Sequence, residues 1–526
     1  MCLCVPSSQC AKKSQESILN MHLKRVLFII AVLFCSSPIA QGRVVVNGAN
    51  YDAAFASDEK CFVVDGQIDL KGRSIKLKEN CTLSFLKDGK LFNGHIIGNN
   101  TKLCSLRAES LGVTLSGTWL ISKIDDVFFD QSALTDTQIL DNITALQSGR
   151  MRNTIILRKP LYQVVLSEEH KVGLILKSNT VLKSSSNILV RGNNLISYSV
   201  IKVGDASNVR INGGHITGDV ETHIFKDGTT SEWGFGISIS KAKNVVVEGV
   251  CISKCIGDGI YVGGGNGAYI GDYSQASKDI VLRDILSIGN RRQGVSITYA
   301  DGVTIKNCVL ANTGAYGLTS PGCGLDIEPN EGQSVRNVSV LSCEFYKNGT
   351  IMDASIGGYK TEKDVCNVEG ILFKNCSFEG KLSIRTGSVV VKRCTLGTLD
   401  IHLAKMPKEK VLFDHCQING GSGVLVRSLG GTTDRHYAPE YRFKSCSFTM
   451  SEAMTPAMFS SINHKGNEVA DFVLDNCSFS FPQGSQHFDM VQAESACSFK
   501  FSKCQIDSQE RTLDMDNTMY KNCRIR

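Results

Sequence analysis

Two acidic residues in one short segment have the spacing for acid–base chemistry. From Gly324 to Glu328 the sequence alternates apolar and acidic residues. This pattern predicts a β-strand that turns Leu325 and Ile327 inward and places Asp326 and Glu328 on the outer face, about 7 Å apart. Two carboxylates at that spacing raise one another's pKa. The alternative is a pair of solvated carboxylates at the edge of a strand.

A third carboxylate stands directly before another short strand. Asp258 lies between two glycines and is followed by the run IYV, in which Tyr261 is expected to face outward. If each strand is one coil of a stacked sheet, Asp258 and Asp326 lie two coils apart, about 10 Å along the axis. Inverting glycosidases hold their carboxyls roughly 6.5–9.5 Å apart. Asp258 with Asp326 or Glu328 is therefore a candidate hydrolytic pair, unless Asp258 merely bonds the backbone amides of its turn.

Basic and amide side chains lie on the coil between these carboxylates. The segment NRRQ contains Arg291, Arg292 and Gln293. A guanidinium there could hold Asp326, bind an anionic sugar or act as the base of an elimination reaction. No CxxC pair or His/Cys cluster has the spacing of metal ligands, so no metal site is predicted.

A polar insertion from His215 to Trp233 precedes the first strand of the candidate site. Trp233 is one of two tryptophans in the chain. An exposed Trp beside a groove is a natural platform for a sugar ring, although a Trp that covers the flank of the fold is as reasonable. His215 and His223 are candidates for acid–base or substrate contacts, or each is structural.

These candidates depend on a repeated strand. The pattern Gly-apolar-x-apolar begins at Gly236, Gly259, Gly294 and Gly324, with spacings of 23, 35 and 30 residues. It predicts one strand per coil, with Ser296 and Thr298 in the outward places of the coil between Tyr261 and Asp326. Loops of varied length, such as 264–275, would then shape a groove at one corner.

A second repeat runs through the later part of the chain as apolar-x-x-Cys-x-apolar, in nine copies at intervals of mostly about 18 to 35 residues. An Asn before several of these cysteines suits a left-handed backbone position. Coils stack about 4.8 Å apart, whereas a disulfide requires a Cβ separation of about 3.8 Å, so reduced core thiols are expected. The nine are Cys308, Cys343, Cys376, Cys394, Cys416, Cys446, Cys477, Cys504 and Cys523.

The fold class that these repeats predict is all-β, a single-stranded right-handed parallel β-helix. A small N-terminal β subdomain is expected over 41–130, followed by β-helix over 131–390 with the candidate site and further coils over 391–526. The amphipathic segment Asp136–Gly149 is expected to be a helix that caps the open end, with the regular sheet starting at about Thr154.

The beginning of the chain resembles an export signal. The stretch Met21–Ala40 has a basic start, an apolar run and small residues at its end, and the residues before Met21 are set aside as a misassigned start. Cys35 is a lipidation alternative, but Phe34 precedes it where a small residue is expected. No later run approaches the roughly 18 apolar residues of a membrane span. We expect a secreted, periplasmic or cell-surface protein.

Charge argues against one class of partner. The 57 basic and 51 acidic residues give a formal charge of +6 and are spread along the chain rather than gathered in blocks. Nucleic acid is therefore not an expected partner.

The chain resembles the pectin-lyase-like superfamily, which includes polygalacturonases, over roughly residues 130 to 380. The resemblance rests on Asp136 and Thr137 in the predicted helix, on GGHITG from Gly213 and on successive NVxIxx strands. The N-terminal runs NCTLSF and NGHIIGNNT also look like the entry domain of β-helix proteins secreted by Bacteroidetes. The resemblance implies a β-helix with a glycan-binding groove.

The polygalacturonase catalytic pattern is only partly present. Phe235 stands where that family has an Asp, Gly257 and Asp258 stand at its paired Asp, and Gln293 replaces its His. Its Arg-Ile-Lys, which holds a uronate, corresponds to Asp326, Ile327 and Glu328. The resemblance therefore implies a shared groove without a shared mechanism.

The function expected from the sequence is a carbohydrate-active protein that binds a polysaccharide or oligosaccharide. A glycoside hydrolase would use the carboxyls of Asp258, Asp326 and Glu328. A polysaccharide lyase is the alternative enzyme; lyases of the resembled superfamily often use Ca²⁺, which these carboxylates could bind, although the dense acidic cluster of such sites is missing. A non-catalytic glycan-binding surface protein is the third possibility. The candidate substrate-binding residues are Arg291, Arg292, Gln293, Trp233, Tyr261, His215 and His223.

Overall fold

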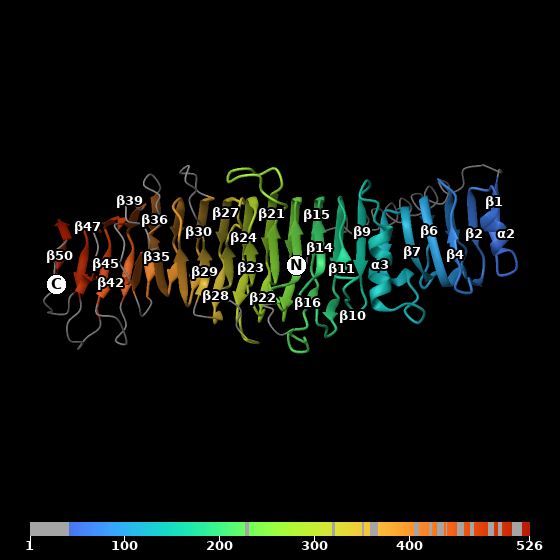
Figure 1. Cartoon of the computed structure of the whole chain (residues 1–526), viewed down its shortest axis with the longest axis horizontal. Coiled ribbons are helices and arrows are strands. Elements are labelled where there is room, and N and C mark those ends of the chain that lie inside the picture. The colour runs from blue at the N-terminus through green and yellow to red at the C-terminus, as the bar shows by residue number, and fades with distance from the viewer. Residues whose placement is uncertain are drawn as a thin grey trace, which may run out of the picture.

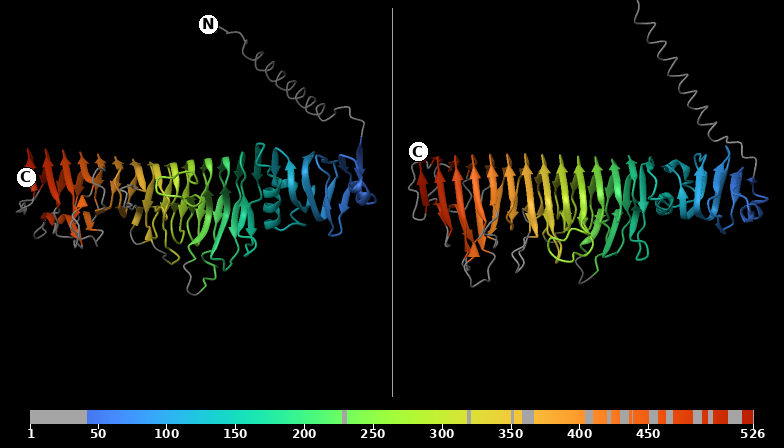
Figure 2. Two further views of the ribbon diagram at one scale, coloured as in Figure 1. Left: turned by 45° about the horizontal axis from the view of Figure 1, so that its top comes forward. Right: turned by 90° about the horizontal axis from the view of Figure 1, so that it is seen from above.

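The computed structural model describes residues 42–525 except 227–230, 318–320, 350–351, 358–366, 404–409, 420–422, 429–435, 438, 450–456, 463–467, 482–488, 493–496 and 508–517. The predicted signal segment lies outside these residues. The described chain forms one long rod of stacked β-strands, with its N-terminal and C-terminal coils at opposite ends (Figure 1). The loops stand out from the sides of the rod (Figure 2).

Three parallel sheets run along the rod and, within the described residues, have 15, 14 and 12 strands. The first runs from β8 (Lys123–Asp125) to β49 (Thr518–Lys521), and the second from β10 (Leu161–Val164) to β50 (Arg524–Ile525). In each sheet a strand pairs with the equivalent strand of the next coil, which is the predicted solenoid. The 12-stranded sheet contains β11 (Val172–Ile175), β14 (Ser197–Gly204), β17 (Trp233–Ser240), β20 (Ile260–Gly263), β23 (Val295–Ile297), β26 (Leu325–Ile327), β29 (Met352–Ile356), β32 (Lys381–Ile384), β35 (Thr398–Leu403), β38 (Val424–Ser428), β42 (Ala457–Ile462) and β46 (Asp489–Gln492).

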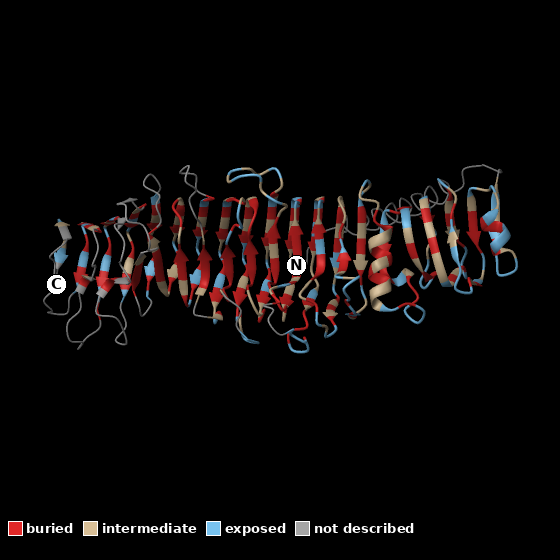
Figure 3. Ribbon diagram, viewed as in Figure 1, coloured by how far each residue is buried: buried red, intermediate tan, exposed pale blue. Residues whose placement is uncertain are grey.

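The four glycine-led strands of the sequence are consecutive in this 12-stranded sheet, as β17, β20, β23 and β26. Apolar residues in matching register, such as Ile260, Val295 and Leu325, fill the interior, where buried positions line every coil (Figure 3). Alternation along each strand turns the residue after each of these outward. The predicted outward row is therefore present, and Tyr261 pairs with Ser296, which pairs with Asp326.

The N-terminal subdomain is a separate parallel sheet of seven strands within the described residues. The first long sheet of the β-helix begins with β8, one strand earlier than the expected start near Thr154, because β8 pairs with β9 (Asn153–Leu157). The short helix α2 (Tyr51–Ala56) follows β1 at the N-terminal end of the rod (Figure 1). The strands are β1 (Arg43–Val46), β2 (Cys61–Val64), β3 (Gln67–Asp69), β4 (Ser74–Lys76), β5 (Thr82–Phe85), β6 (Lys90–Cys104) and β7 (Leu111–Leu120).

The predicted helix is present as α3 (Asp136–Leu146) and, as expected, covers the open end of the β-helix at β11, while the N-terminal sheet packs on its other side. It lies between β7 of the N-terminal sheet and the first coils of the β-helix (Figure 1). The helix begins with a capping box, in which Thr135 Oγ1 accepts from the Gln138 amide at 3.2 Å and Gln138 Oε1 accepts from the Thr135 amide at 2.9 Å. This pairing satisfies backbone groups that a helix start leaves open.

Side chains of α3 replace the strand that would otherwise cover each sheet edge. Asn142 is 1% exposed, and its amide donates to Val113 O at 2.9 Å and accepts from Leu115 N at 2.7 Å on the β7 side. On the other side Thr144 Oγ1 accepts from Ile175 N in β11 at 3.2 Å. The helix is thus an internal plug, because buried sheet edges need hydrogen-bond partners on both sides.

The cysteine ladder and its turn are as predicted. The described cysteines are all free thiols, and those of the ladder are buried apart from the half-buried Cys523. A thiol such as that of Cys376 donates to a backbone oxygen of the coil before it, here Val340 O at 3.4 Å. The residue before each of these cysteines is left-handed, with φ of 53° at Asn307 and 55° at Asn476.

Candidate functional site

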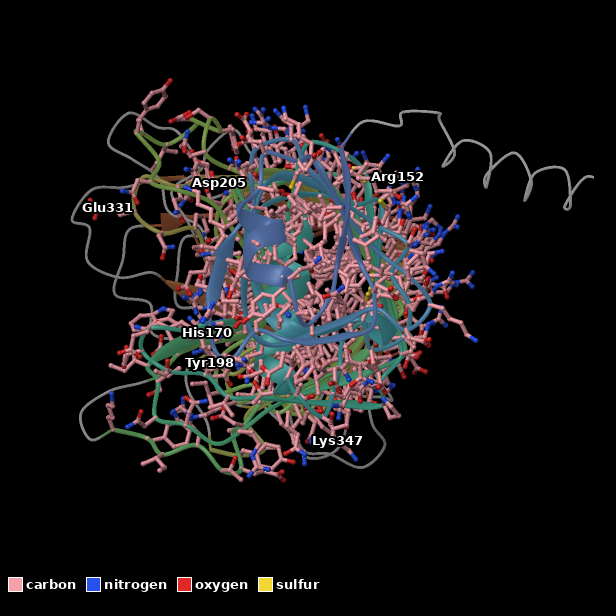
Figure 4. The ribbon with its side chains drawn as sticks, turned by 90° about the vertical axis from the view of Figure 1, so that its right-hand side faces the viewer. Arg152, His170, Tyr198, Asp205, Glu331 and Lys347 are labelled. Carbon is pink, nitrogen blue, oxygen red and sulfur yellow. The ribbon has the colours of Figure 1, made fainter. Side chains whose placement is uncertain are left out.

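The outer face of the 12-stranded sheet gathers the candidate residues. In the view along the rod axis, Tyr198 and Asp205, at the two ends of β14, mark this face, and Arg152 of the 15-stranded side lies on the opposite flank (Figure 4). On this face the outward side chains of β20, β23 and β26 are stacked one coil apart.

Glycines at the start of these strands let the coils approach closely. Ile260 N donates to Gly294 O at 3.1 Å, and Val295 N donates to Gly324 O at 2.9 Å. A Cβ on Gly294 would lie 2.6 Å from Gly324 O, so a larger residue would push the coils apart. This close approach brings the residue before each glycine into contact with side chains of the next coil.

Asp258 is one of these residues, and it is completely buried. Its side chain is 0% exposed, and both of its carboxyl oxygens lie 3.4 Å from Nη1 of Arg292. Burial raises the pKa of Asp258 to about 7, although the charge of Arg292 and hydrogen bonds from Arg292 and Ser296 oppose the rise. Asp258 therefore contacts the side chains of its own and the next coil rather than solvent.

Asp326 faces outward as predicted, but it is not solvated. Its residue is 2% exposed, because the side chains of the neighbouring coil cover it, and the Gln293 amide donates a hydrogen bond to its Oδ2. Burial first, and then the charge of Glu328, raise the pKa of Asp326 well above its ordinary value.

Glu328 completes this pair and is exposed. Within the described residues, Oδ1 of Asp326 is buried and has no hydrogen-bond partner. The arrangement is therefore a covered carboxyl whose pKa is raised beside a second carboxyl that is exposed to solvent.

Arg292 connects the carboxyls of the site. Its Nη1 donates to Gln293 Oε1 at 3.0 Å, and its Nε lies 3.7 Å from a carboxyl oxygen of Glu232. Burial is the largest influence on the pKa of Arg292 and lowers it, but the charges of Asp258, Asp326 and Glu232 together raise it above the ordinary value. A guanidinium held in its charged form is a poor base, which argues against the elimination that it would have to start.

Two aromatic rings lie beside the carboxyls. The rings of Phe235 and Tyr261 stack with centroids 4.8 Å apart and planes 15° from parallel, and both residues are half-buried. Tyr261 Oη lies 2.9 Å from Thr298 Oγ1. The resemblance placed Phe235 where a carboxylate is lost; in the structure its ring lies against that of Tyr261, and the two form an apolar surface that strand alternation did not predict.

Arg291 was expected in the site but points away from it. Its guanidinium lies 4.5 Å from the ring centroid of Phe225, and its Nη1 donates to Ser231 O and Ile256 O at 3.4 Å. Adjacent residues of an irregular corner project in different directions, so Arg292 enters the carboxyl cluster while Arg291 holds the inserted loop.

The two histidines are not part of the cluster. His215 is exposed on β16 (His215–Thr217), which belongs to the 14-stranded sheet. The His223 side chain is 0% exposed; its Nδ1 lies 2.9 Å from Asp219 Oδ2, and Asp219 also accepts from Tyr198 Oη at 2.6 Å. His223 therefore anchors the insertion, and neither histidine lies among the carboxyls of the candidate site.

Trp233 remains a candidate. It starts β17, two residues before Phe235 on the sheet that carries the site, and it is 52% exposed. An exposed ring at this place extends the apolar strip formed by Phe235 and Tyr261.

Two further observations concern ions and membranes. Among the described residues, no group of three or more His, Cys, Asp or Glu side chains is arranged to hold a metal ion. The helices of the described chain include none that is long and apolar enough to cross a membrane.

Comparison with known sequences gives partial matches. The family model of the right-handed β-helix region matches residues 167–331. Two uncharacterized proteins of Bacillus subtilis (strain 168) are similar. YclG is 32% identical over 197 residues, which cover 36% of this chain and 34% of the relative. The SPbeta prophage-derived YorA is 32% identical over 190 residues, which cover 34% of this chain and 32% of the relative. The chain spans about a third of the length of these curated relatives.

Solved structures resemble the chain in fold. The A-module of the mannuronan C-5 epimerase AlgE6 of Azotobacter vinelandii has a TM-score of 0.51 and 15% identity, covering 75% of this chain and 96% of that one. A tailspike protein double mutant of E. coli bacteriophage HK620 has a TM-score of 0.51 and 13% identity, covering 76% and 78%. The protein therefore has the right-handed parallel β-helix fold that its sequence predicts.

Proposed function

We propose that the protein is a glycan-cleaving enzyme, a glycoside hydrolase, whose reacting groups are Asp326 and Glu328. The observation that carries this proposal is the placement of a buried carboxyl, whose pKa is raised, two residues from an exposed one on the outer face of the sheet. Such a pair supplies the acid and the base that glycoside hydrolysis requires. The stacked rings of Phe235 and Tyr261 beside it provide a surface on which a sugar ring can lie.

In the proposed reaction Asp326 donates its proton to the glycosidic oxygen as the bond to the leaving sugar breaks. Glu328 accepts a proton from the water that attacks the anomeric carbon, so atoms and charge balance over the step. Inverting enzymes separate these carboxyls by roughly 6.5–9.5 Å, which is farther than a hydrogen bond. Glu328 is exposed and at the end of its strand, so its side chain is free to turn outward and admit the water and the sugar.

Asp258, Arg292 and Gln293 position this pair. Gln293 holds Oδ2 of Asp326 by a hydrogen bond, Arg292 holds Oε1 of Gln293, and Asp258 holds Arg292. The chain of contacts fixes which oxygen of Asp326 is free to carry the proton. Asp258 thus takes the role of a positioning residue rather than a contact to substrate.

The solved structures agree with a polysaccharide as substrate. One is by its title a mannuronan epimerase and another a bacteriophage tailspike, and tailspike structures of the same phage have been solved in complex with pentasaccharide and hexasaccharide. We further propose that the protein acts outside the cytoplasm, on the strength of the predicted signal segment Met21–Ala40.

A reducing-sugar screen of neutral and acidic polysaccharides, with and without calcium, tests the proposal. D326N and E328Q are each expected to lower kcat/KM by about 10²–10⁴-fold, the usual contribution of a general acid or base. The matched control E344Q alters an exposed Glu of β28 (Glu344–Tyr346) on another sheet and is expected to leave activity unchanged. Circular dichroism of each variant checks that the fold is intact.

The pH profile separates a chemical role from a structural one. Because the charge of Glu328 raises the pKa of Asp326, the residual activity of E328Q is expected to fall at a lower pH than that of the wild type as Asp326 loses its proton. Full activity of D326N or E328Q contradicts the proposed pair. An unsaturated product that absorbs in the far ultraviolet would make the protein a lyase, and binding without any product would make it a glycan-binding protein.

A further inference from the structure

A row of basic side chains continues the active-site column toward the C-terminus. On the 12-stranded sheet Asp326 pairs with Ser355 of β29, which pairs with Ser383 of β32, which pairs with Asp400 of β35 (Figure 1). The outward places two residues further along these strands hold Glu328, Gly357, Arg385, His402 and Arg427. Of these, His402 and Arg427 lie directly opposite each other on neighbouring strands. The basic residues lie two, three and four coils from Glu328, about 10 to 19 Å along the axis.

Little side-chain bulk separates the two groups. Gly357 occupies the coil between Glu328 and Arg385, and a Cβ placed on it would already lie 3.8 Å from Cγ of Glu328. A glycan chain that leaves the carboxyl pair along the sheet therefore meets Arg385 as the next charged side chain of this row.

Positive charge is in excess in this cluster. Among the described residues, Asp400 is the one carboxylate within ion-pair distance of these basic side chains. Its carboxyl oxygens lie 2.7 Å from Nε of Arg427, 3.6 Å from Nε2 of His402 and 3.8 Å from Nζ of Lys381. Burial raises the pKa of Asp400, but hydrogen bonds from His402 and Arg427 and their charges outweigh it and lower the pKa below its usual value. One ionised carboxylate thus lies beside two permanent cations, those of Lys381 and Arg427, and Arg385 adds a third to the same face.

The guanidinium of Arg385 is only partly satisfied by the residues around it. Among the described residues no carboxylate pairs with it, and its Nε is buried without a hydrogen-bond acceptor. Ser383, two residues before it on the same face, is 0% exposed, and its Oγ is also buried without a partner. Buried polar groups are almost always satisfied, so two neighbouring unsatisfied ones indicate a place where a ligand or ordered water supplies the missing atoms.

We propose that Arg385, His402 and Arg427 form an anion-binding subsite that holds a carboxylate or sulfate group of a glycan bound at the carboxyl pair. The subsite deepens the proposed function and rests on it, since it assumes that the glycan lies along this sheet. It differs in place from the uronate-binding Arg-Ile-Lys of the polygalacturonases, whose position here is acidic. The carboxyl pair itself repels anions, so the acidic group is held away from the scissile bond.

Binding measured by calorimetry on the full-length protein tests the subsite. E328Q serves as the background, so that binding is read without turnover, and the probes are polygalacturonate and alginate for carboxylates, dextran sulfate for sulfates and unmodified dextran as the neutral polymer. R385Q is expected to weaken binding of one acidic class roughly tenfold to hundredfold, the usual effect of removing a charged hydrogen bond, and to leave dextran unaffected. The class that responds names the anionic group.

Arg385 is suited to this test because its removal leaves no carboxylate unpaired. The matched control is R210Q, which removes an exposed arginine of β15 (Ser207–Asn212) on the 15-stranded sheet. H402Q provides a second variant within the subsite and is expected to weaken the same class of probe.

The outcomes separate the two proposals. Equal affinity of R385Q and its background for every acidic probe overturns the subsite, even if a glycan is hydrolysed. Binding of an acidic probe that depends on Arg385, with no product from any glycan, supports the subsite and overturns the hydrolase. An equal loss in R210Q overturns the subsite as well, because it means that general charge attraction accounts for binding.

Discussion

At the residue scale, burial decides the chemistry of the carboxyls. Asp258 and Asp326 are both closed off from solvent, which raises the pKa of each carboxyl, whereas Glu328 is exposed. Three similar side chains thus acquire different roles from their surroundings. A reaction with one acid and one base requires carboxyls in different surroundings.

Asp258 also makes a prediction about stability. Its pKa is raised from 3.8 to about 7, so it keeps a proton in the folded state at pH values where the unfolded chain has released it. The associated stability is present below about pH 4 and is lost as the pH rises to about 7, by on the order of 4 kcal/mol. Because Asn cannot ionise, D258N is expected to lack this loss.

Thermal and urea unfolding of the two proteins between pH 4 and 8 measure this difference. The free energy of unfolding of D258N, relative to the wild type, is expected to increase steadily with pH over that range. A difference that stays constant with pH would show that Asp258 is ionised throughout, and the raised pKa would then be wrong.

At the element scale, α3 shows how a helix can take the place of a coil. Parallel sheets expose a row of backbone donors and acceptors at each edge, and α3 covers one such edge on each of its sides. Asn142 hydrogen-bonds to the backbone of β7, and Thr144 accepts a hydrogen bond from the Ile175 amide of β11. The helix thereby joins the N-terminal sheet to the β-helix that carries the site.

Replacement of Asn142 tests this role. N142A leaves the buried amide of Leu115 and the carbonyl of Val113 without partners, and each buried group left unpaired costs about 1–3 kcal/mol. We expect N142A to lower the free energy of unfolding by about 2–5 kcal/mol in urea titrations. D141A is the control at a half-buried position of the same helix, where the carboxyl lies 3.4 Å from His170 Nε2, and it is expected to cost no more than about 1 kcal/mol. An equal effect of both variants would argue against edge capping.

At the scale of the whole molecule, each coil contacts mainly its neighbours. Stability in such a solenoid is a sum of local terms, so opening is expected to begin at the ends and at junctions. The central strands around β20, β23 and β26 have neighbours on both sides and hold the site on a firm support.

Hydrogen exchange followed by mass spectrometry tests this picture. Amides of β20 to β26 are expected to exchange more slowly than those of β1 and β50 at the two ends. N142A is expected to speed exchange in β7 and β11, beside the plug, and to leave β35 and β38 unchanged. Uniform acceleration along the whole rod would show that the molecule opens as one cooperative unit instead.

Much of this structure follows from the sequence alone. The glycine-led strands, the left-handed Asn before the ladder cysteines and the capping box of α3 are local patterns, and each element forms from residues close together in the chain. The outward register of Tyr261, Ser296 and Asp326 follows from the same alternation. Strand periodicity thus determined the fold class and the face on which the candidate site lies.

The tertiary structure decided which of these residues meet. Asp326 is buried because Gln293 of the preceding coil covers it, Arg292 enters the cluster while Arg291 leaves it, and α3 is a plug because a second sheet precedes it. Each of these facts depends on contacts between segments some 30 residues apart, set by the length of each coil and the direction of each corner. Local sequence patterns carry no information on coil length or corner direction. They therefore identified the residues of the candidate site but not which of its carboxyls are buried.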